Sequence, residues 1–234
     1  MVIFLLFLFY CIVTLATYQC FSYIQKRLGF IWLNPMMLSM VTIIPFLIIN
    51  EISFKQYYQY TQVFSYLLEP AIVALGYPLY QQLQTIKSNA SIIFKTLAAS
   101  IMTMLVINVL LTFIILNSSE VAVSLALKSV TTPIGLSLAE DLNGIAAITA
   151  VGIIVAGIVG GAFGIRFLSF VGVTCPKAQG LGVGCASHAL GTATITPISS
   201  EHGAFSSLAL VLSAVITAVM SPIIIPLLLS LLNA

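Results

Sequence analysis

Charged residues are scarce in this sequence: Asp, Glu, Lys and Arg make up 6% of its 234 residues, whereas 60% are hydrophobic. A soluble domain carries roughly 25% charged residues, so a soluble fold is excluded. The mean hydropathy of +1.16 agrees, and the chain is predicted to be an integral membrane protein surrounded by membrane lipid. Because the net charge is only +2 and basic residues do not cluster, the sequence lacks the footprint of a nucleic-acid-binding protein.

Several short motifs are also missing. The four cysteines form no CxxC pair, so neither a disulfide framework nor a zinc site is indicated, and no metal is expected. There is no GxSxG, no HExxH and no Gly-rich phosphate loop. The sequence therefore predicts neither an enzyme with catalytic residues nor a bound cofactor.

What the chain has in abundance is long apolar runs separated by short polar turns. A spanning helix needs about 20 apolar residues, which predicts about eight spans, with seven as the alternative. The runs are continuous rather than alternating, so the fold class is all-α and polytopic, not a membrane barrel. The expected helices are Val2 to Tyr23, Ile31 to Ile49, Val63 to Leu83, Ile92 to Leu116, Val121 to Leu138, Ile145 to Phe170, Leu181 to Ile195 and Ala204 to Leu232.

The predicted domain organisation is one transmembrane domain over 1–234, with scaffold helices in 1–60 and a core in 63–234. Proline, glycine and polar residues interrupt the core around 69–78, 128–135 and 182–194. In lipid, backbone groups freed by such breaks must find protein or water, so broken helices are expected in the interior. A weak internal repeat relates 78–90 to 133–145 and predicts a broken short helix, a turn and a long helix in each copy.

The break at 128–135 carries a lysine and three hydroxyls. Lys128 either attracts an anionic substrate or, as a lysine near a helix end, extends its ammonium to the membrane surface. Ser129, Thr131 and Thr132 precede Pro133, where unwinding is easiest. Their hydroxyls either bind a ligand or return to carbonyls of their own helix, and the clustering beside a lysine favours a ligand site.

The stretch at 182–194 carries the second polar group. Ser187, His188, Gly191 and Thr192 lie in a glycine-rich apolar segment, where a histidine is a functional candidate. His188 is expected to hydrogen-bond a carboxylate or to carry a coupling proton, and the alternative is a neutral bond between helices. Ser187 and His188 do not form a hydrolase pair, because neighbouring helical residues point about 100° apart.

Other polar residues are less distinctive. Glu69 before Pro70 is expected either to couple to a proton or to Lys128, or to stabilise a helix start. Asn34 before Pro35 either orients a carboxylate or starts a turn. Glu201 and His202 lie in a turn before a helix and are expected to be solvated.

With these residues in view, the chain resembles the LrgB/CidB family of bacterial membrane proteins, especially its YohK-like members. The resemblance runs from about Leu33 to the C-terminus. The segments that carry it are LNPMM (33–37), EPAIVALGYPLYQQL (69–83), KSVTTPIG (128–135), GIAAITAV (144–151), ASHALGTA (186–193) and GAFSSLAL (203–210). The family's motifs correspond to Lys128, Ser129, Thr131, Thr132 and Pro133, and to Ser187, His188, Gly191 and Thr192.

The resemblance implies two functions of different classes. One is transport of small monocarboxylates such as glycolate, glycerate or pyruvate, and the other is antiholin-like control of murein hydrolase export and cell lysis with a small LrgA/CidA-type membrane partner. The chain departs from the family where Thr194 replaces an expected arginine and where Glu69 replaces a small or amide residue. Both departures weaken the binding of an anion.

The sequence thus predicts a multi-pass protein of the bacterial inner membrane. The leading hypothesis is an organic-acid transporter, possibly ion-coupled through Glu69 or His188. In it, Lys128 attracts the small organic acid anion, while Asn34, Ser129, Thr131, Thr132, Ser187, His188, Gly191 and Thr192 form the binding site. The alternative hypothesis is the lysis regulator, and a homodimer would suit a chain of this size.

Overall fold

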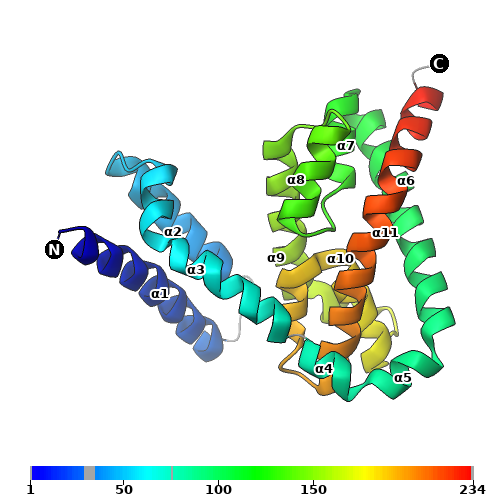
Figure 1. Cartoon of the computed structure of the whole chain (residues 1–234), viewed down its shortest axis with the longest axis horizontal. Helices are drawn as coiled ribbons and strands as arrows, with labels where there is room; N and C mark the ends of the chain where they lie inside the picture. The colour runs from blue at the N-terminus through cyan, green and yellow to red at the C-terminus, as the bar shows by residue number, and fades with distance from the viewer. Residues whose placement is uncertain (1, 29–34, 75, 233–234) are drawn as a thin grey trace. The chain divides into compact units, whose positions relative to one another are not determined.

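The computed structural model describes residues 2–28, 35–74 and 76–232, and every regular element in these ranges is helical (Figure 1). The helices are α1 (Val2–Leu28), α2 (Pro35–Ile49), α3 (Phe54–Ala74), α4 (Gly76–Gln81), α5 (Leu83–Ser88), α6 (Ala90–Leu116), α7 (Ser119–Ala126), α8 (Thr132–Asp141), α9 (Ala146–Phe170), α10 (Pro176–Ile195) and α11 (Ser200–Leu232). The predicted all-α class is confirmed.

Four of the described helices, α1, α6, α9 and α11, are long and apolar enough to cross a membrane. In α6, one side is buried at every fourth residue, from Ile93 through Ile101 to Val109. The opposite side carries Ile107 and Leu111, which are also apolar although exposed. A helix that is apolar all round is suited to lipid on one side and protein on the other.

Of the other four predicted spans, those at 63–83 and 121–138 each cover more than one helix, whereas the described part of 31–49 is the single helix α2 and 181–195 lies within α10. The run expected at 121–138 consists of α7 and α8 with 127–131 between them, and the run at 63–83 consists of the end of α3 followed by α4 and α5. The break expected around 128–135 is therefore present, whereas α3 continues through Pro70 to Ala74, and residue 75, between α3 and α4, lies outside the described residues. Both copies of the predicted repeat have short helices leading into a long one, α4 and α5 into α6, and α8 into α9.

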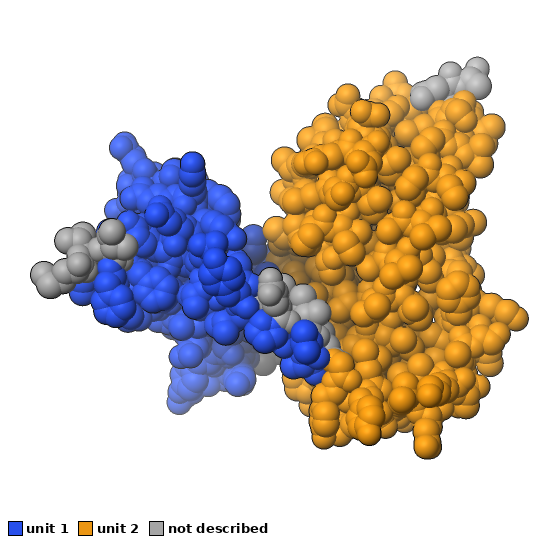
Figure 2. All heavy atoms as spheres, viewed as in Figure 1, with its two compact units in different colours: residues 1–74 blue, residues 75–234 orange. Residues whose placement is uncertain are grey.

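The chain forms two compact units, 1–74 and 75–234, which Figure 2 colours separately. In the first unit, α1 packs against α2 and α3. The ring of Tyr10 meets Tyr57 edge-on and stacks on Tyr60, and the hydroxyls of Thr14 and Tyr57 are 2.7 Å apart. The single domain with a core from 63 stays a prediction.

In the second unit, α10 packs between α9 and α11, and α6 packs along α11. Glycines let these backbones approach closely. A Cβ atom on Gly184 of α10 would lie 2.3 Å from the carbonyl oxygen of Ser206 in α11, and one on Gly160 of α9 would lie 1.5 Å from Ser187 Oγ. This close packing of α9, α10 and α11 positions the polar residues of the site.

Candidate functional site

The first broken segment lies between α7 and α8. Ser118 caps α7 by accepting a hydrogen bond from the Val121 amide at 3.4 Å, and Pro133 stands in the first turn of α8, where its missing N–H costs nothing. Lys128, Ser129 and Thr131 lie between the two helices. The break between α7 and α8 therefore contains three of the predicted site residues.

Lys128 is half-buried, and its ammonium donates a hydrogen bond to Asn108 Oδ1 of α6. Asn108 is fixed in turn, because its amide nitrogen donates to the Met104 carbonyl at 2.7 Å. A Cβ atom on Gly152 of α9 would lie 3.4 Å from Lys128 Cβ. The lysine therefore lies between α6 and α9 and has a neutral amide as its partner.

The hydroxyls of this segment differ in their surroundings. Ser129 is 8% exposed and its Oγ has no hydrogen-bond partner. Thr131 and Thr132 are half-buried, and Thr131 does not cap α8 with its side chain. Ser129 is therefore the hydroxyl of this segment with free hydrogen-bonding capacity in a buried position.

The second broken segment is a kink inside α10. His188 has φ 42° and ψ −141°, so the helix is interrupted at that residue. A non-glycine residue in such a conformation costs about 1–3 kcal/mol and persists where its surroundings hold it. The break expected within 182–194 is present, and it falls on the histidine rather than on a glycine.

His188 is held by α9. It is 4% exposed, and its Nε2 lies 2.9 Å from the Ile153 carbonyl oxygen. Since a carbonyl only accepts, Nε2 carries the proton. A Cβ atom on Gly157 would lie 2.8 Å from the imidazole Cε1, so the ring fills the space that this glycine leaves.

Thr192 completes this segment. Its hydroxyl donates to the His188 carbonyl at 2.9 Å and lies 2.8 Å from Ser206 Oγ of α11. Because Thr192 has one hydroxyl proton, Ser206 is the donor in the second bond. Ser187 Oγ is buried without a partner, and Gly191 packs against Ser187, to which an added Cβ would come within 2.5 Å.

The structure brings the two broken segments to consecutive residues of α9, Lys128 beside Gly152 and His188 on Ile153. Among the described residues, no hydrogen bond joins Lys128 to His188. Asn34 lies outside the described residues, and for Glu69 the structure describes the backbone within α3 but not the side chain. The convergence of all predicted site residues on one chamber stays a prediction.

Sequence reasoning missed a stripe of buried hydroxyls along α11. Its members are Ser206, Ser213, Thr217 and Ser221, which are at most 5% exposed. Their spacing of seven, four and four residues places them on one helix face, and that spacing was the available signal. Asn108, the partner of Lys128, was also missed, since a lone amide in an apolar run gives no sign of which helix it faces.

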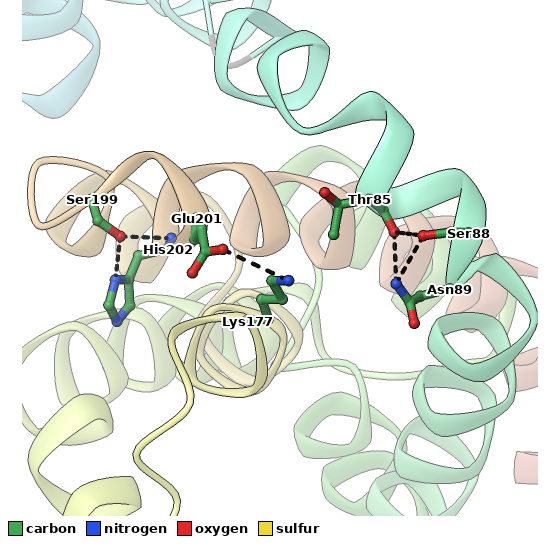
Figure 3. A network of polar contacts seen from close by, with 7 residues as sticks. All are labelled: Thr85, Ser88, Asn89, Lys177, Ser199, Glu201 and His202. Carbon is green, nitrogen blue, oxygen red and sulfur yellow. Dashed lines mark hydrogen bonds and ion pairs between the residues drawn. The ribbon is translucent and has the colours of Figure 1, made fainter.

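The expectation for His202 was wrong, because this residue is 6% exposed rather than solvated. Its Nδ1 lies 2.8 Å from Ser199 Oγ, and its Nε2 lies 2.9 Å from Gln179 Oε1 of α10. Figure 3 shows the Ser199 contact beside the Lys177–Glu201 ion pair of 3.7 Å and the Asn89 contacts at the α5–α6 turn. The His202–Gln179 hydrogen bond and the Lys177–Glu201 ion pair connect the start of α11 to α10.

Comparison with known proteins gives consistent matches over most of the chain. A family model described as "LrgB-like family" matches residues 14–227. The chain is 34% identical over 207 residues to a protein of Staphylococcus aureus named "Holin-like protein CidB", covering 87% of this chain and 89% of that protein. A protein of the same name from Staphylococcus epidermidis is 33% identical with the same coverage.

A further relative, from Haemophilus influenzae, is 34% identical over 203 residues, with 87% of this chain and 88% of that protein covered. No solved structure matches this chain. The similarity extends over both compact units and includes both broken segments of the second unit.

Proposed function

The chain belongs to the LrgB-like family, and from that premise we propose that it is a holin-like protein of the bacterial inner membrane that controls murein hydrolase export and cell lysis. The observation that carries this proposal is the 34% identity, over 87% of the chain, to a protein named holin-like. The four helices of the described residues that are able to cross a membrane suit this location.

The geometry of the polar residues supports lysis control over transport of an anion. Lys128 has a hydrogen bond to Asn108, and His188 has one to the Ile153 carbonyl. An ammonium has three N–H donors, so a carboxylate can bind Lys128 beside the Asn108 bond. To accept a hydrogen bond from the neutral His188 imidazole, however, it would have to take the Nε2 proton from the Ile153 carbonyl, for which lipid offers no substitute. The His188 proton is therefore already used within the protein.

In this role the protein acts by assembly, with a small LrgA/CidA-type membrane partner and with further copies of itself. The exposed apolar side chains of the transmembrane helices, such as Ile107 and Leu111 of α6 and Val155 of α9, provide faces for helix contacts within the bilayer. In lipid such contacts depend on close packing and not on hydrophobicity. Larger side chains introduced on these helix faces should therefore disturb the assembly and change lysis control.

The test is deletion of the gene in its own host, followed by complementation. Lysis rate in detergent and murein hydrolase activity of the culture supernatant, read on peptidoglycan gels, are both expected to change on deletion and to return with the wild-type chain. Co-purification of the small partner from membranes is expected as well. Unchanged lysis and unchanged hydrolase activity would contradict the proposal.

Transport of a small monocarboxylate is the second candidate. It is favoured by one observation: the break between α7 and α8 holds Lys128 and, next to it in the sequence, Ser129, whose buried hydroxyl has no hydrogen-bond partner. In this candidate Lys128 attracts the anion and Ser129, Thr131 and Thr132 orient it. Asn34, Ser187, Gly191 and Thr192 complete the site, with Glu69 or His188 as the proton-coupling group.

Uptake into vesicles that contain the purified protein alone separates the two candidates. Labelled glycolate, glycerate and pyruvate are offered under proton and sodium gradients, with Lys128→Ala and His188→Ala as comparison proteins. A carrier moves at least one of them and loses the flux in both variants. If none moves, transport is excluded and lysis control remains.

A further inference from the structure

Two neighbouring cavities in the second unit have lining residues that, apart from Ser129, neither proposed function uses. The first is a groove of about 350 Å³ between α6 and α10, with Leu97, Leu181 and Cys185 among its lining residues. The second is a small inner cavity of about 10 Å³, on the order of the space that one water molecule needs. Met104 and Cys185 line both cavities, so they form the wall between them.

The inner cavity is polar on one side. Ser129, Ser213 and Thr217 bring their side chains to it from the α7–α8 break and from α11. Ser129 Oγ is buried and without a partner, and Ser213 Oγ donates to the Leu210 carbonyl at 3.1 Å, which leaves its lone pairs free to accept. The cavity therefore offers both a donor and acceptors to a group about the size of a hydroxyl.

The groove outside it is mainly apolar and open at its rim. Ala178, Gly182 and Ala186 of α10 stand on one rim and Thr96 and Ser100 of α6 on the other. Of the described residues that line the two cavities, none is charged. A large apolar cavity with a few polar groups at one end is typical of sites for small molecules, and the lack of charged lining residues favours a neutral one.

From this arrangement we propose that the groove and the inner cavity form one binding site for a small neutral molecule with a hydroxyl at the end of an apolar body. The hydroxyl lies in the inner cavity between Ser129 and Ser213, and the body lies in the groove. The Met104 side chain, which has several rotatable bonds, moves aside to join the two cavities. The site is distinct from Lys128 and His188.

The test uses the Cys185 thiol as a reporter in the wall of the site. Replacing the other cysteines by serine, at Cys11, Cys20 and Cys175, leaves it as the sole thiol. The rate of its modification by N-ethylmaleimide is measured on the purified full chain with increasing hexan-1-ol, and with hexane as the ligand without a hydroxyl. Hexan-1-ol is expected to slow the modification severalfold, and hexane is expected to have a much smaller effect.

Two variants separate the hydroxyl contact from general damage. Ser129→Ala should raise the half-protecting concentration of hexan-1-ol by roughly threefold to tenfold, as expected for the loss of one neutral hydrogen bond. Ser207→Ala is the matched control, because Ser207 Oγ is also buried without a partner but does not line either cavity. It should leave the protection unchanged.

Equal protection by hexan-1-ol and hexane would show that the groove accepts any apolar chain, including a lipid tail, and would overturn the proposal. So would the absence of protection, or equal effects of the two serine variants. If Cys185 resists the reagent without ligand, fluorine line broadening of 6-fluorohexan-1-ol decides instead. Broadening that does not weaken in Ser129→Ala relative to Ser207→Ala would also overturn the proposal.

Discussion

The two broken segments of the second unit differ in how far their polar groups are satisfied by hydrogen bonds. Each frees backbone groups that lipid cannot satisfy. The α10 kink is closed: His188 binds the Ile153 carbonyl, and Thr192 joins the His188 carbonyl to Ser206. The α7–α8 break retains spare capacity, because Ser129 Oγ has no partner and lines a cavity. Ser187 Oγ beside the kink also lacks a partner, but its side chain fills the space beside Gly160. A helix break is therefore not by itself a binding site, since the free hydroxyl of the α7–α8 break lines a cavity whereas that of the kink is packed against α9.

The closed packing of α10 can be broken most strongly at Gly184. The side chain introduced by Gly184→Val would meet the backbone of Ser206, whose carbonyl oxygen lies 2.3 Å from the position of the new Cβ. We expect a loss of about 3 kcal/mol in the free energy of unfolding, because neither backbone can yield without separating the helices. The measurement is unfolding in mixed detergent micelles, followed by circular dichroism.

Gly182→Ala is the control for this prediction. Its new Cβ would lie 3.3 Å from Leu168 Cδ1, a flexible side-chain end. Stability should stay the same or rise by up to about 1 kcal/mol, the usual gain in helix propensity. Equal destabilisation by both substitutions would contradict the account of close α10–α11 packing.

At the α7–α8 break, the hydrogen bond between Lys128 and Asn108 can be removed by substitution. Asn108→Leu should destabilise the protein by about 2 kcal/mol or more, because it leaves a half-buried ammonium without its hydrogen bond. Adding Lys128→Met should recover most of that loss. Additive effects in this double-mutant cycle would show that the two side chains do not interact.

The hydrogen bonds of Thr192 stabilise the α10 kink to a smaller extent. Thr192→Val keeps the shape but removes the bonds to the His188 carbonyl and Ser206, and we expect a loss of about 1 kcal/mol, in the range of such bonds within membranes. Thr194→Val is the matched substitution, because Thr194 bonds only within its own helix turn, to the Gly191 carbonyl. A loss as large in Thr194→Val would contradict the role given to the bond with α11.

The strained backbone at the kink gives the smallest expected difference. His188→Gly and His188→Ala both lose the bond to Ile153, but glycine adopts a φ of 42° without strain. The glycine variant should therefore be more stable than the alanine variant by about 1 kcal/mol. A less stable glycine variant would mean that the positive φ is not retained in solution.

The sequence predicted the fold class and the places of two helix breaks, at 128–135 and within 182–194, because apolar run length, proline and clustered polar residues act locally. It did not predict which side chains from different helices form contacts. Asn108 and Ser206 are found only once the rotation of α6 and α11 about their axes is known. His202 was misjudged because its neighbour Glu201 is half-exposed and ion-paired, while helix geometry turns the histidine inward to Gln179. The predicted convergence of Lys128 and His188 was not decidable from one sequence, because their nearest partners come from α6 and α9.

The contrast between an open and a closed break is tested most directly with two serines that share burial and the lack of a partner, Ser129 and Ser187. Ser129→Cys and Ser187→Cys are each made in a chain whose native cysteines are replaced by serine, and modification by N-ethylmaleimide is timed. The cysteine at 129 should react many times faster, because it lines a cavity that the proposed movement of Met104 opens to the groove, whereas the Ser187 side chain fills the space beside Gly160. Equal rates, or faster reaction at 187, would contradict the account.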